Sequence, residues 1–376
     1  DIRPDNSFNY SWRVRVWDET DTPSEWSSEA KFRAVPERLS SGQWIGAITR
    51  QNAHLPEGRK FHGGELKKPE VKAAWEAVDT LAKKSICLRR TFQVGDAKEG
   101  GANRKPGKKI VEATAYVCGL GFYEFSLNGK KVGNSEFAPL WSDYDKTVYY
   151  NTYDVTEQLR RGENVVGILL GNGFYNVQGG RYRKLQISFG PPTLLFELVI
   201  NYEDGTCTTV HSDNNWKYDF SPVTFNCIYG GEDYDARREQ KGWNQIGFDD
   251  SHWRPVVIQE APKGILRPQM AAPVKIMERY DIQKVTKLNA DQVASASVST
   301  KRTVDLSAFV LDMGQNLAGF PEITVRGKRG QKVTLIVAEA LTEEGACNQR
   351  QTGRQYYYEY TLNCLLYTSP SPRDST

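Results

Sequence analysis

Short stretches of alternating apolar and polar residues, separated by turns, recur along most of this chain. In residues 10–16 every second side chain is apolar, and the intervening side chains are serine or arginine. Asn128-Gly129 and Asp204-Gly205 each stand between two such stretches, and both dipeptides are typical of hairpin turns. A period of two marks strands with one buried face. The pattern therefore predicts a mostly β protein with tandem antiparallel, jelly-roll-like β-sandwich domains.

One segment departs from this pattern. Residues 69–85 place apolar side chains at helical spacing and predict a short surface helix. No long helix is predicted elsewhere.

Changes in composition along the chain predict four segments. Residues 1–35 have the form of the last hairpin of an immunoglobulin- or fibronectin-like domain, which we expect to be truncated because two strands cannot bury a face alone. Residues 36–272 and 273–363 are predicted to be two β-sandwich domains, the second truncated at its C-terminal end. Residues 364–376 are dominated by Ser, Pro and charged residues and are expected to be a non-native or disordered tail.

Charge and cysteine spacing exclude several classes of function. The formal net charge is +3 over 376 residues, with basic and acidic residues interspersed, so no nucleic-acid partner is expected. No window approaches the roughly 20 consecutive apolar residues of a membrane-spanning helix. The six cysteines are widely spaced and form no CxxC pair, which argues against zinc and against a disulfide framework.

The motifs in order along the chain resemble one family. The stretch from "YVCGLGFYEF" to "LLGNGFY" (116–175) and the stretch "YGGEDYDARREQKGW" (229–243) resemble the N-terminal β-sandwich domain of bacterial α-L-rhamnosidases. "LDMGQNLAGF" (311–320) and "QYYYEYTL" (355–362) resemble the concanavalin-like sandwich that follows that domain. The resemblance covers residues 1 to about 363.

The resemblance implies a parent glycoside hydrolase that releases terminal α-L-rhamnose with inversion. In that family the acid and base glutamates lie on a helical toroid that follows these modules. We therefore expect no catalytic residue in this chain, no activity from it alone, and packing of its sandwiches on the catalytic domain. No cofactor is expected to be required, and a periplasmic or extracellular location is expected for the parent. The alternatives are a free-standing carbohydrate-binding protein and the front end of another glycosidase, such as a β-galactosidase-like enzyme.

The acidic stretch at 229–243 invites a different interpretation, because it contains enough carboxylates for a general acid and a general base. Carboxylates that are close in sequence do not establish the separation of about 6.5–9.5 Å that inverting hydrolysis requires. We interpret the stretch as a structural ion-pair loop whose members are Glu232, Asp235, Arg237 and Glu239.

Two loops carry residues suited to sugar binding. The resemblance implies calcium-assisted rhamnose binding in some relatives, and such a site needs oxygen ligands and an apolar wall. The candidate residues of the two loops are Trp141, Asp143, Tyr144, Asn172, Phe174 and Tyr175. In the opposing interpretation the aromatic residues fill the core and the polar residues cap turns. The expected partners are rhamnose-containing glycans or glycosides. His252 lies beside two acids but has no ligand partner at metal spacing, so we expect it to be structural.

Overall fold

The structure is a computed structural model that describes residues 9–33, 39, 41–56, 60–95, 108–181, 185–296, 307–350, 355–363 and 367–369. The chain divides into two compact units, residues 1–41 and residues 42–376. Most of the expected tail falls outside the described residues. The predicted segment boundaries at 35/36, 272/273 and 363/364 stay predictions.

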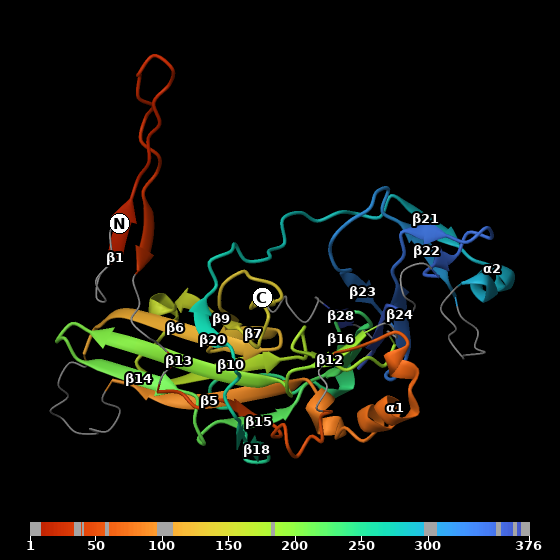
Figure 1. Cartoon of the computed structure of the whole chain (residues 1–376), viewed down its shortest axis with the longest axis horizontal. Helices are drawn as coiled ribbons and strands as arrows, with labels where there is room; N and C mark the ends of the chain where they lie inside the picture. The colour runs from red at the N-terminus through yellow and green to blue at the C-terminus, as the bar shows by residue number, and fades with distance from the viewer. Residues whose placement is uncertain are drawn as a thin grey trace. The chain divides into compact units, whose positions relative to one another are not determined.

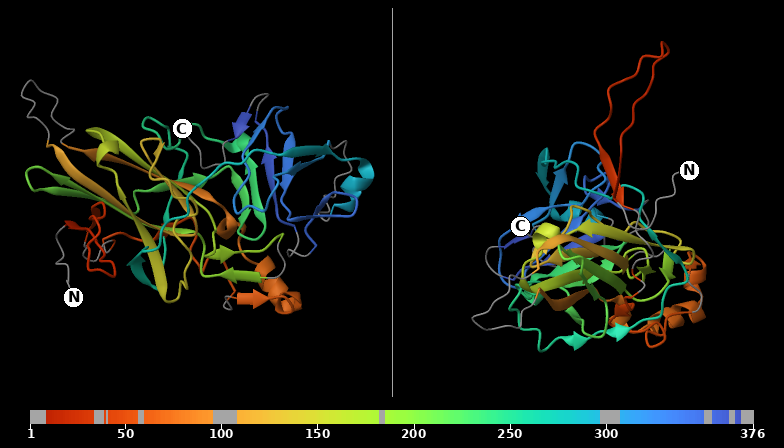
Figure 2. Two further views of the ribbon diagram at one scale, coloured as in Figure 1. Left: turned by 90° about the horizontal axis from the view of Figure 1, so that it is seen from above. Right: turned by 90° about the vertical axis from the view of Figure 1, so that its left-hand side faces the viewer.

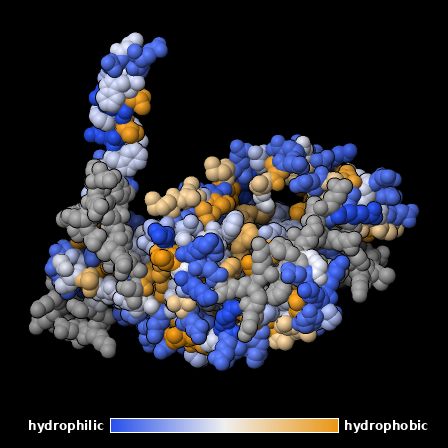
Figure 3. Space-filling view, in the orientation of Figure 1, coloured by the Kyte–Doolittle hydropathy of each residue, from blue (hydrophilic) through white to orange (hydrophobic). Residues whose placement is uncertain are grey.

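Unit 1 is the predicted hairpin. Strand β1 (Asn9–Trp12) pairs antiparallel with β2 (Ala30–Arg33), and the chain between them continues as a long twisted ribbon (Figure 1). Arg15 lies over the rings of Trp17 and Trp26, 5.4 and 4.8 Å from their centroids. Val14 and Val16 are exposed, and orange residues mark the ribbon in Figure 3.

Unit 2 is built around two stacked sheets whose strands are antiparallel except for the pair β9 and β20 (Figures 1 and 2). The six-stranded sheet has the order β18 (Arg254–Pro255), β15 (Lys217–Phe220), β5 (Ile86–Val94), β10 (Gly162–Leu170), β7 (Tyr123–Leu127), β8 (Lys130–Lys131). The seven-stranded sheet has the order β19 (Val257–Ile258), β3 (Ile45–Gly46), β13 (Thr193–Tyr202), β6 (Ile110–Leu120), β9 (Thr147–Asp154), β20 (Ile265–Pro268), and β14 (Cys207–His211) pairs with β13. The predicted fold class, mostly β with sandwich domains, is confirmed.

The core of unit 2 lies between these two sheets. Alternate residues of the central strands point into it, among them Leu88 of β5, Ile168 of β10 and Phe196 of β13, all fully buried. The Asn128-Gly129 turn joins β7 to β8 as predicted, and both of its residues have positive φ, 53° and 81°. Such a conformation suits Asn and Gly in a two-residue hairpin turn.

The helix in the structure is shorter than the one that the apolar pattern of residues 69–85 predicts. Helix α1 spans Pro69–Glu76 and is followed by a 3-10 turn, η2 (Thr80–Lys83). Both elements cover a satellite core that contains Trp75 and Val78. A further 3-10 turn, η1 (Glu65–Lys67), precedes α1, and η3 (Thr156–Gln158) follows β9.

Smaller sheets complete unit 2. A three-stranded sheet has the order β11 (Asn176–Val177), β12 (Leu185–Ser188), β4 (Lys60–His62). Two-stranded sheets pair β21 (Lys284–Lys287) with β22 (Phe309–Asp312), β23 (Ile323–Val325) with β28 (Tyr367–Ser369), and β25 (Ala340–Leu341) with β26 (Cys347–Asn348). The short helix α2 (Ala290–Ser295) has a capping box formed by Asn289 and Gln292.

A four-stranded sheet joins parts of the chain that are far apart in sequence. Its order is β16 (Val223–Cys227), β17 (Gly231–Asp235), β27 (Tyr357–Thr361), β24 (Lys332–Ile336). Strands β17 and β27 are parallel, from Gly231 opposite Tyr357 to Asp235 opposite Thr361. The backbones approach so closely that a Cβ on Gly231 would lie 2.0 Å from the Tyr357 carbonyl oxygen. Gly231 also has φ +89°, so this position requires glycine.

Arg181 stabilises the parallel pairing of β17 with β27, called the joint below. Its side chain is 9% exposed and donates both to the Tyr357 carbonyl, at 2.9 Å, and to the two carboxylate oxygens of Asp233, at 2.5 Å. Its guanidinium also lies over the Phe225 and Tyr357 rings. Burial raises the pKa of Asp233 above its ordinary value despite this partner. Arg181 thus links its own segment to β17 through the ion pair with Asp233 and to β27 through the Tyr357 carbonyl.

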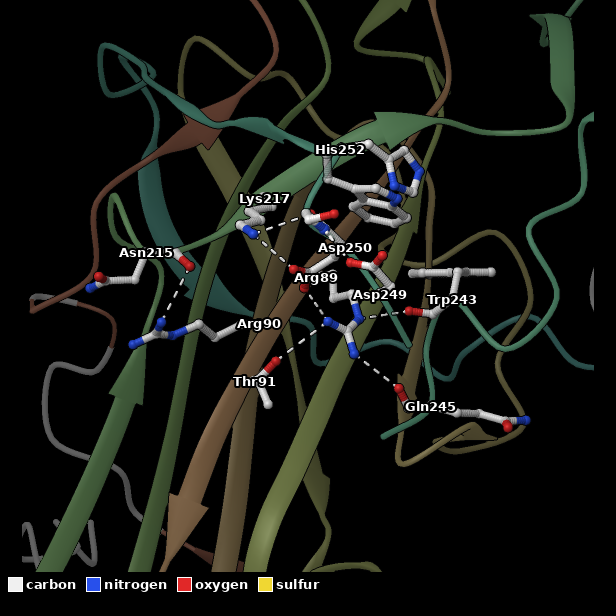
Figure 4. A network of polar contacts seen from close by, with 12 residues as sticks. Arg89, Arg90, Thr91, Asn215, Lys217, Trp243, Gln245, Asp249, Asp250 and His252 are labelled. Atoms are coloured by element: carbon white, nitrogen blue, oxygen red, sulfur yellow. Dashed lines mark hydrogen bonds and ion pairs between the residues drawn. The ribbon is translucent and has the colours of Figure 1, made fainter. Parts of the chain in front are cut away.

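A second buried arginine holds the segment that precedes β18. Figure 4 shows the Arg89 guanidinium pointing at the carbonyl oxygens of Trp243 and Gln245, at 2.8 and 2.9 Å, and at the Asp250 carboxylate. Lys217 of β15 donates to the same carboxylate at 2.8 Å. Burial acts to raise the pKa of Asp250, but the hydrogen bond from Lys217 and the charges of Arg89 and Lys217 outweigh it, and the pKa is lowered.

We predict that Arg181→Ala weakens the joint by about 3–5 kcal/mol, because Asp233 is left partly buried without its partner. Hydrogen exchange at the amides of β27 should accelerate more than exchange in β10. Arg238→Ala is the matched control, since Arg238 is largely exposed and reaches Asp235 only at 3.5 Å, and it should cost at most about 1 kcal/mol. Equal effects of the two substitutions on β27 would contradict the role given to Arg181.

Arg89→Ala should cost about 3–5 kcal/mol in the free energy of unfolding, because two carbonyls and Asp250 lose a buried donor. Among the described residues, the side chain of neighbouring Arg90 makes one hydrogen bond, 3.2 Å to the Asn215 carbonyl, as Figure 4 shows. Arg90→Ala should therefore cost about 1 kcal/mol or less. Chemical denaturation of both variants measures the difference, and a reversed order would show that Arg89 is not the anchor.

The lowered pKa of Asp250 predicts a pH dependence. A carboxyl group whose pKa falls on folding stabilises the fold fully above its unfolded value, near 3.8, and loses this contribution as the pH falls through the folded value. Asp250→Asn should therefore be less stable than the parent chain at about pH 6, and the gap should close in strong acid as Asp250 protonates. A gap that persists unchanged at about pH 2 would contradict this.

Candidate functional site

The two loops proposed for sugar binding meet through their aromatic residues. The first loop lies between β8 and β9, and the second follows β10. The rings of Trp141 and Phe174 contact each other with centroids 5.4 Å apart and a tilt of 39°. Tyr144 and Tyr175 also meet edge to face, at 5.1 Å.

Trp141 is not a core residue. Its side chain is 63% exposed, while Phe174 beneath it is half-buried. Phe174 belongs to a larger aromatic cluster in which neighbouring ring centroids are 5.4–6.1 Å apart and whose members are Phe122, Phe137, Trp141, Phe174, Tyr229 and Phe320. The cluster holds the inner face of Trp141 and leaves the indole largely open to solvent.

Tyr144 and Tyr175 have a structural position. Both are buried, and each packs against Phe189 at 5.1 and 5.9 Å. Burial raises the pKa of Tyr144, with smaller contributions from Cys118 and Tyr175. These two rings therefore support the loops from below and do not form an open wall for a sugar.

Asn172 is engaged inside the protein. It is 1% exposed, and its amide nitrogen donates to the Lys83 carbonyl at 3.0 Å. Its side-chain oxygen accepts from the amide of Asn176 at 2.8 Å, and its backbone N–H donates to Asn226. The oxygen that a cation would need is thus already used to hold the second loop on the segment around η2.

Asp143 closes a turn. Its carboxylate pairs with Lys146 at 3.0 Å and accepts from the Asp145 N–H at 3.3 Å. The hydrogen bond from Lys146 lowers the pKa of Asp143. Asp143 and Asn172 together therefore do not fit the oxygen-rich, multidentate set that calcium needs. The part of the chain that the structure describes holds no group of three or more His, Cys, Asp or Glu suited to a metal ion, and calcium binding stays a prediction.

An open hollow of about 650 Å³ lies beside Trp141. Its lining comes from Leu140 and Trp141, from Tyr149 of β9, and from residues 267–271 in and after β20. The sequence analysis missed Tyr149 and Arg267. The two residues come together through the parallel pairing of β9 with β20, which places Arg267 opposite Tyr149. No local sequence pattern reveals such a register.

The acidic stretch at 229–243 is a strand where a loop was expected. Its first half is β17, paired on both sides, and a 3-10 turn, η4 (Ala236–Arg238), follows. Asp235 pairs with Arg237 at 2.8 Å, and Glu239 accepts from the Tyr234 hydroxyl at 2.7 Å. Glu232 lies on β17 between Asn226 and Tyr358 of the neighbouring strands. The local sequence could not show that β27 would supply the pairing partner.

His252 accompanies the Arg89 network at the surface. One of its ring nitrogens lies 3.2 Å from the side-chain oxygen of Gln240, which also accepts from the Trp253 indole at 2.9 Å. Neighbouring Asp249 accepts from the Ser251 N–H. These contacts close the turn before β18.

Within the described residues no helix is long and apolar enough to cross a membrane.

Comparison with known proteins gives two family matches in order along the chain. The α-L-rhamnosidase N-terminal domain matches residues 108–278, and the bacterial α-L-rhamnosidase concanavalin-like domain matches residues 302–368. An α-L-rhamnosidase of Formosa agariphila is 34% identical, over 89% of this chain and 32% of the relative. One of Alteromonas sp. is 31% identical, over 88% of this chain and 31% of the relative.

Solved structures agree with these matches. The α-L-rhamnosidase from Dictyoglumus thermophilum superposes with a TM-score of 0.69 at 28% identity, covering 94% of this chain and 35% of that one. The α-L-rhamnosidase from Aspergillus terreus gives 0.71 at 25% identity, covering 96% and 36%. The chain spans about a third of the length of the curated relatives that it matches. Through its N-terminal β-sandwich domain and its concanavalin-like domain, the chain belongs to the bacterial α-L-rhamnosidase family.

Proposed function

We propose that this chain supplies the accessory N-terminal β modules of an α-L-rhamnosidase that releases terminal α-L-rhamnose from glycans or glycosides. The observation that carries the proposal is the occurrence of both family domains, in order, on one chain. In the full-length protein a general acid protonates the leaving oxygen, and a general base activates water for inversion. We place both groups on a helical domain outside this chain.

The modules would pack on that catalytic domain and shape its cleft. An exposed apolar segment supports this role, because a contiguous apolar surface is usually covered by a partner. The segment that follows β20 exposes Met270, Val274, Ile276 and Met277, and hydrophobic residues gather over it in the upper middle of Figure 3.

The remaining parts of the proposal concern the parent protein. It would act on rhamnose-containing glycans in the periplasm or outside the cell, with no cofactor required for hydrolysis. Calcium-assisted rhamnose retention by the sandwich would need oxygen ligands other than the Asp143 and Asn172 pair. Cell fractionation of the source organism tests the location.

Two other functions compete with this proposal: a free-standing carbohydrate-binding protein and the front end of another glycosidase. The reading frame in the source DNA distinguishes them. Helical hairpins that carry glutamates after residue 363 support the rhamnosidase, whereas a stop codon there supports the free-standing module. A different catalytic domain there supports the second rival.

We predict that the purified chain hydrolyses no p-nitrophenyl α-L-rhamnopyranoside, because neither catalytic carboxyl group of the proposed mechanism lies in it. The release of nitrophenolate is followed against a full-length protein recovered from the same source DNA, which should be active. Clear turnover by the chain alone would refute the accessory role.

A further inference from the structure

The hollow beside Trp141 has the parts of a sugar subsite. The exposed indole offers a flat apolar face, and Phe174 contacts the ring and limits its movement. Pyranose rings present C–H groups on one face, and these pack on aromatic rings as other apolar groups do. A volume of about 650 Å³ accommodates at least one sugar ring.

Arg267 provides the polar contact in this hollow. It lies opposite Tyr149 in the parallel pairing of β20 with β9, so the two side chains belong to the same face of the sheet. Within the described part of the chain the Arg267 side chain forms no ion pair or hydrogen bond. Asp143, the acidic residue nearest to Trp141 in the sequence of this loop, is already paired with Lys146. Arg267, whose side chain has no partner among the described residues, therefore lines the hollow together with Trp141.

The walls of the hollow are fixed before any ligand arrives. The side-chain oxygen of Gln269 accepts from the Leu140 N–H at 2.9 Å and from Asn151 at 3.1 Å. Ser142 donates to the Thr147 carbonyl at 2.6 Å across the base of the loop. These bonds tie the segment after β20 to the Trp141 loop, so a ligand pays little ordering entropy for its site.

We infer that this hollow binds an acidic sugar of a glycan, with the pyranose ring on Trp141 and its carboxylate on Arg267, and without a calcium ion. A planar guanidinium matches a carboxylate in two parallel hydrogen bonds, which a neutral sugar cannot offer. The inference rests on the proposed function only for the role of the glycan as a substrate or an anchor of the parent enzyme. Binding itself is measurable on this chain alone.

The experiment compares methyl β-D-glucuronide with methyl β-D-glucoside, which differ only in carrying a carboxylate or a hydroxymethyl group. Saturation-transfer NMR and calorimetry measure the binding of each to the whole chain. We expect the glucuronide to bind about fivefold or more tightly than the glucoside. Addition of EDTA should change neither affinity.

Substitutions separate the two contacts. Arg267→Gln should remove the preference for the glucuronide, and Arg267→Lys should keep part of it. Trp141→Ala should weaken both ligands. Lys263→Gln removes an exposed positive charge that is four residues from Arg267 in sequence and does not line the hollow, and it should change neither affinity. All three substituted positions are exposed, so thermal unfolding should be unchanged and serves as the check on folding.

Several outcomes overturn the inference: no binding of either ligand, equal binding of both, a preference that survives Arg267→Gln, or binding that EDTA abolishes. These outcomes leave the proposed function standing, because rhamnoside hydrolysis by the full-length protein does not depend on them. Conversely, glucuronide binding with an inactive full-length protein would refute the proposed function alone.

Discussion

Burial of apolar side chains between the six-stranded and seven-stranded sheets is the constraint on which the rest of unit 2 depends. Leu88, Ile168 and Phe196 lie in this layer with no exposed surface. Each methylene group removed from water stabilises the fold by roughly 0.8 kcal/mol. Because the layer fixes both sheets, it also fixes the ends of the strands, and the loop that carries Trp141 takes its position from β9.

Two buried arginines hold segments that lie outside these two sheets. Arg89 and Arg181 each donate to two backbone carbonyls or more and to one carboxylate. A buried guanidinium is costly unless its donors are satisfied, and carbonyl oxygens fixed by sheets and turns satisfy them without further ordering. Arg267 differs from these two arginines, because it is exposed and its side chain has no partner in the part of the chain that the structure describes.

The sequence was sufficient for features that are local in the chain. Alternation predicted the strands, and Asn128-Gly129 predicted its hairpin, because both depend on residues close to one another. The helix expected over 69–85 ends at Glu76, since the chain turns there to bury Val78. Asn172 was proposed as a ligand from its loop, but its burial depends on carbonyls of Lys83 and Asn226, which no local pattern connects to it. The pairing of β17 with β27 and that of β9 with β20 were missed for the same reason.

The parallel pairing of β17 with β27 bears on how the chain is synthesised. Gly231 leaves the ribosome on the order of 100 residues before its partner Tyr357, which at about 5–20 residues per second is on the order of ten seconds. During that interval one side of β17 has no neighbour, and an open strand invites pairing with another nascent chain. Charged side chains discourage such contacts, and this strand carries Glu232, Asp233 and Asp235. The acidic side chains of β17 thus disfavour pairing of the nascent chain with other nascent chains before β27 is synthesised.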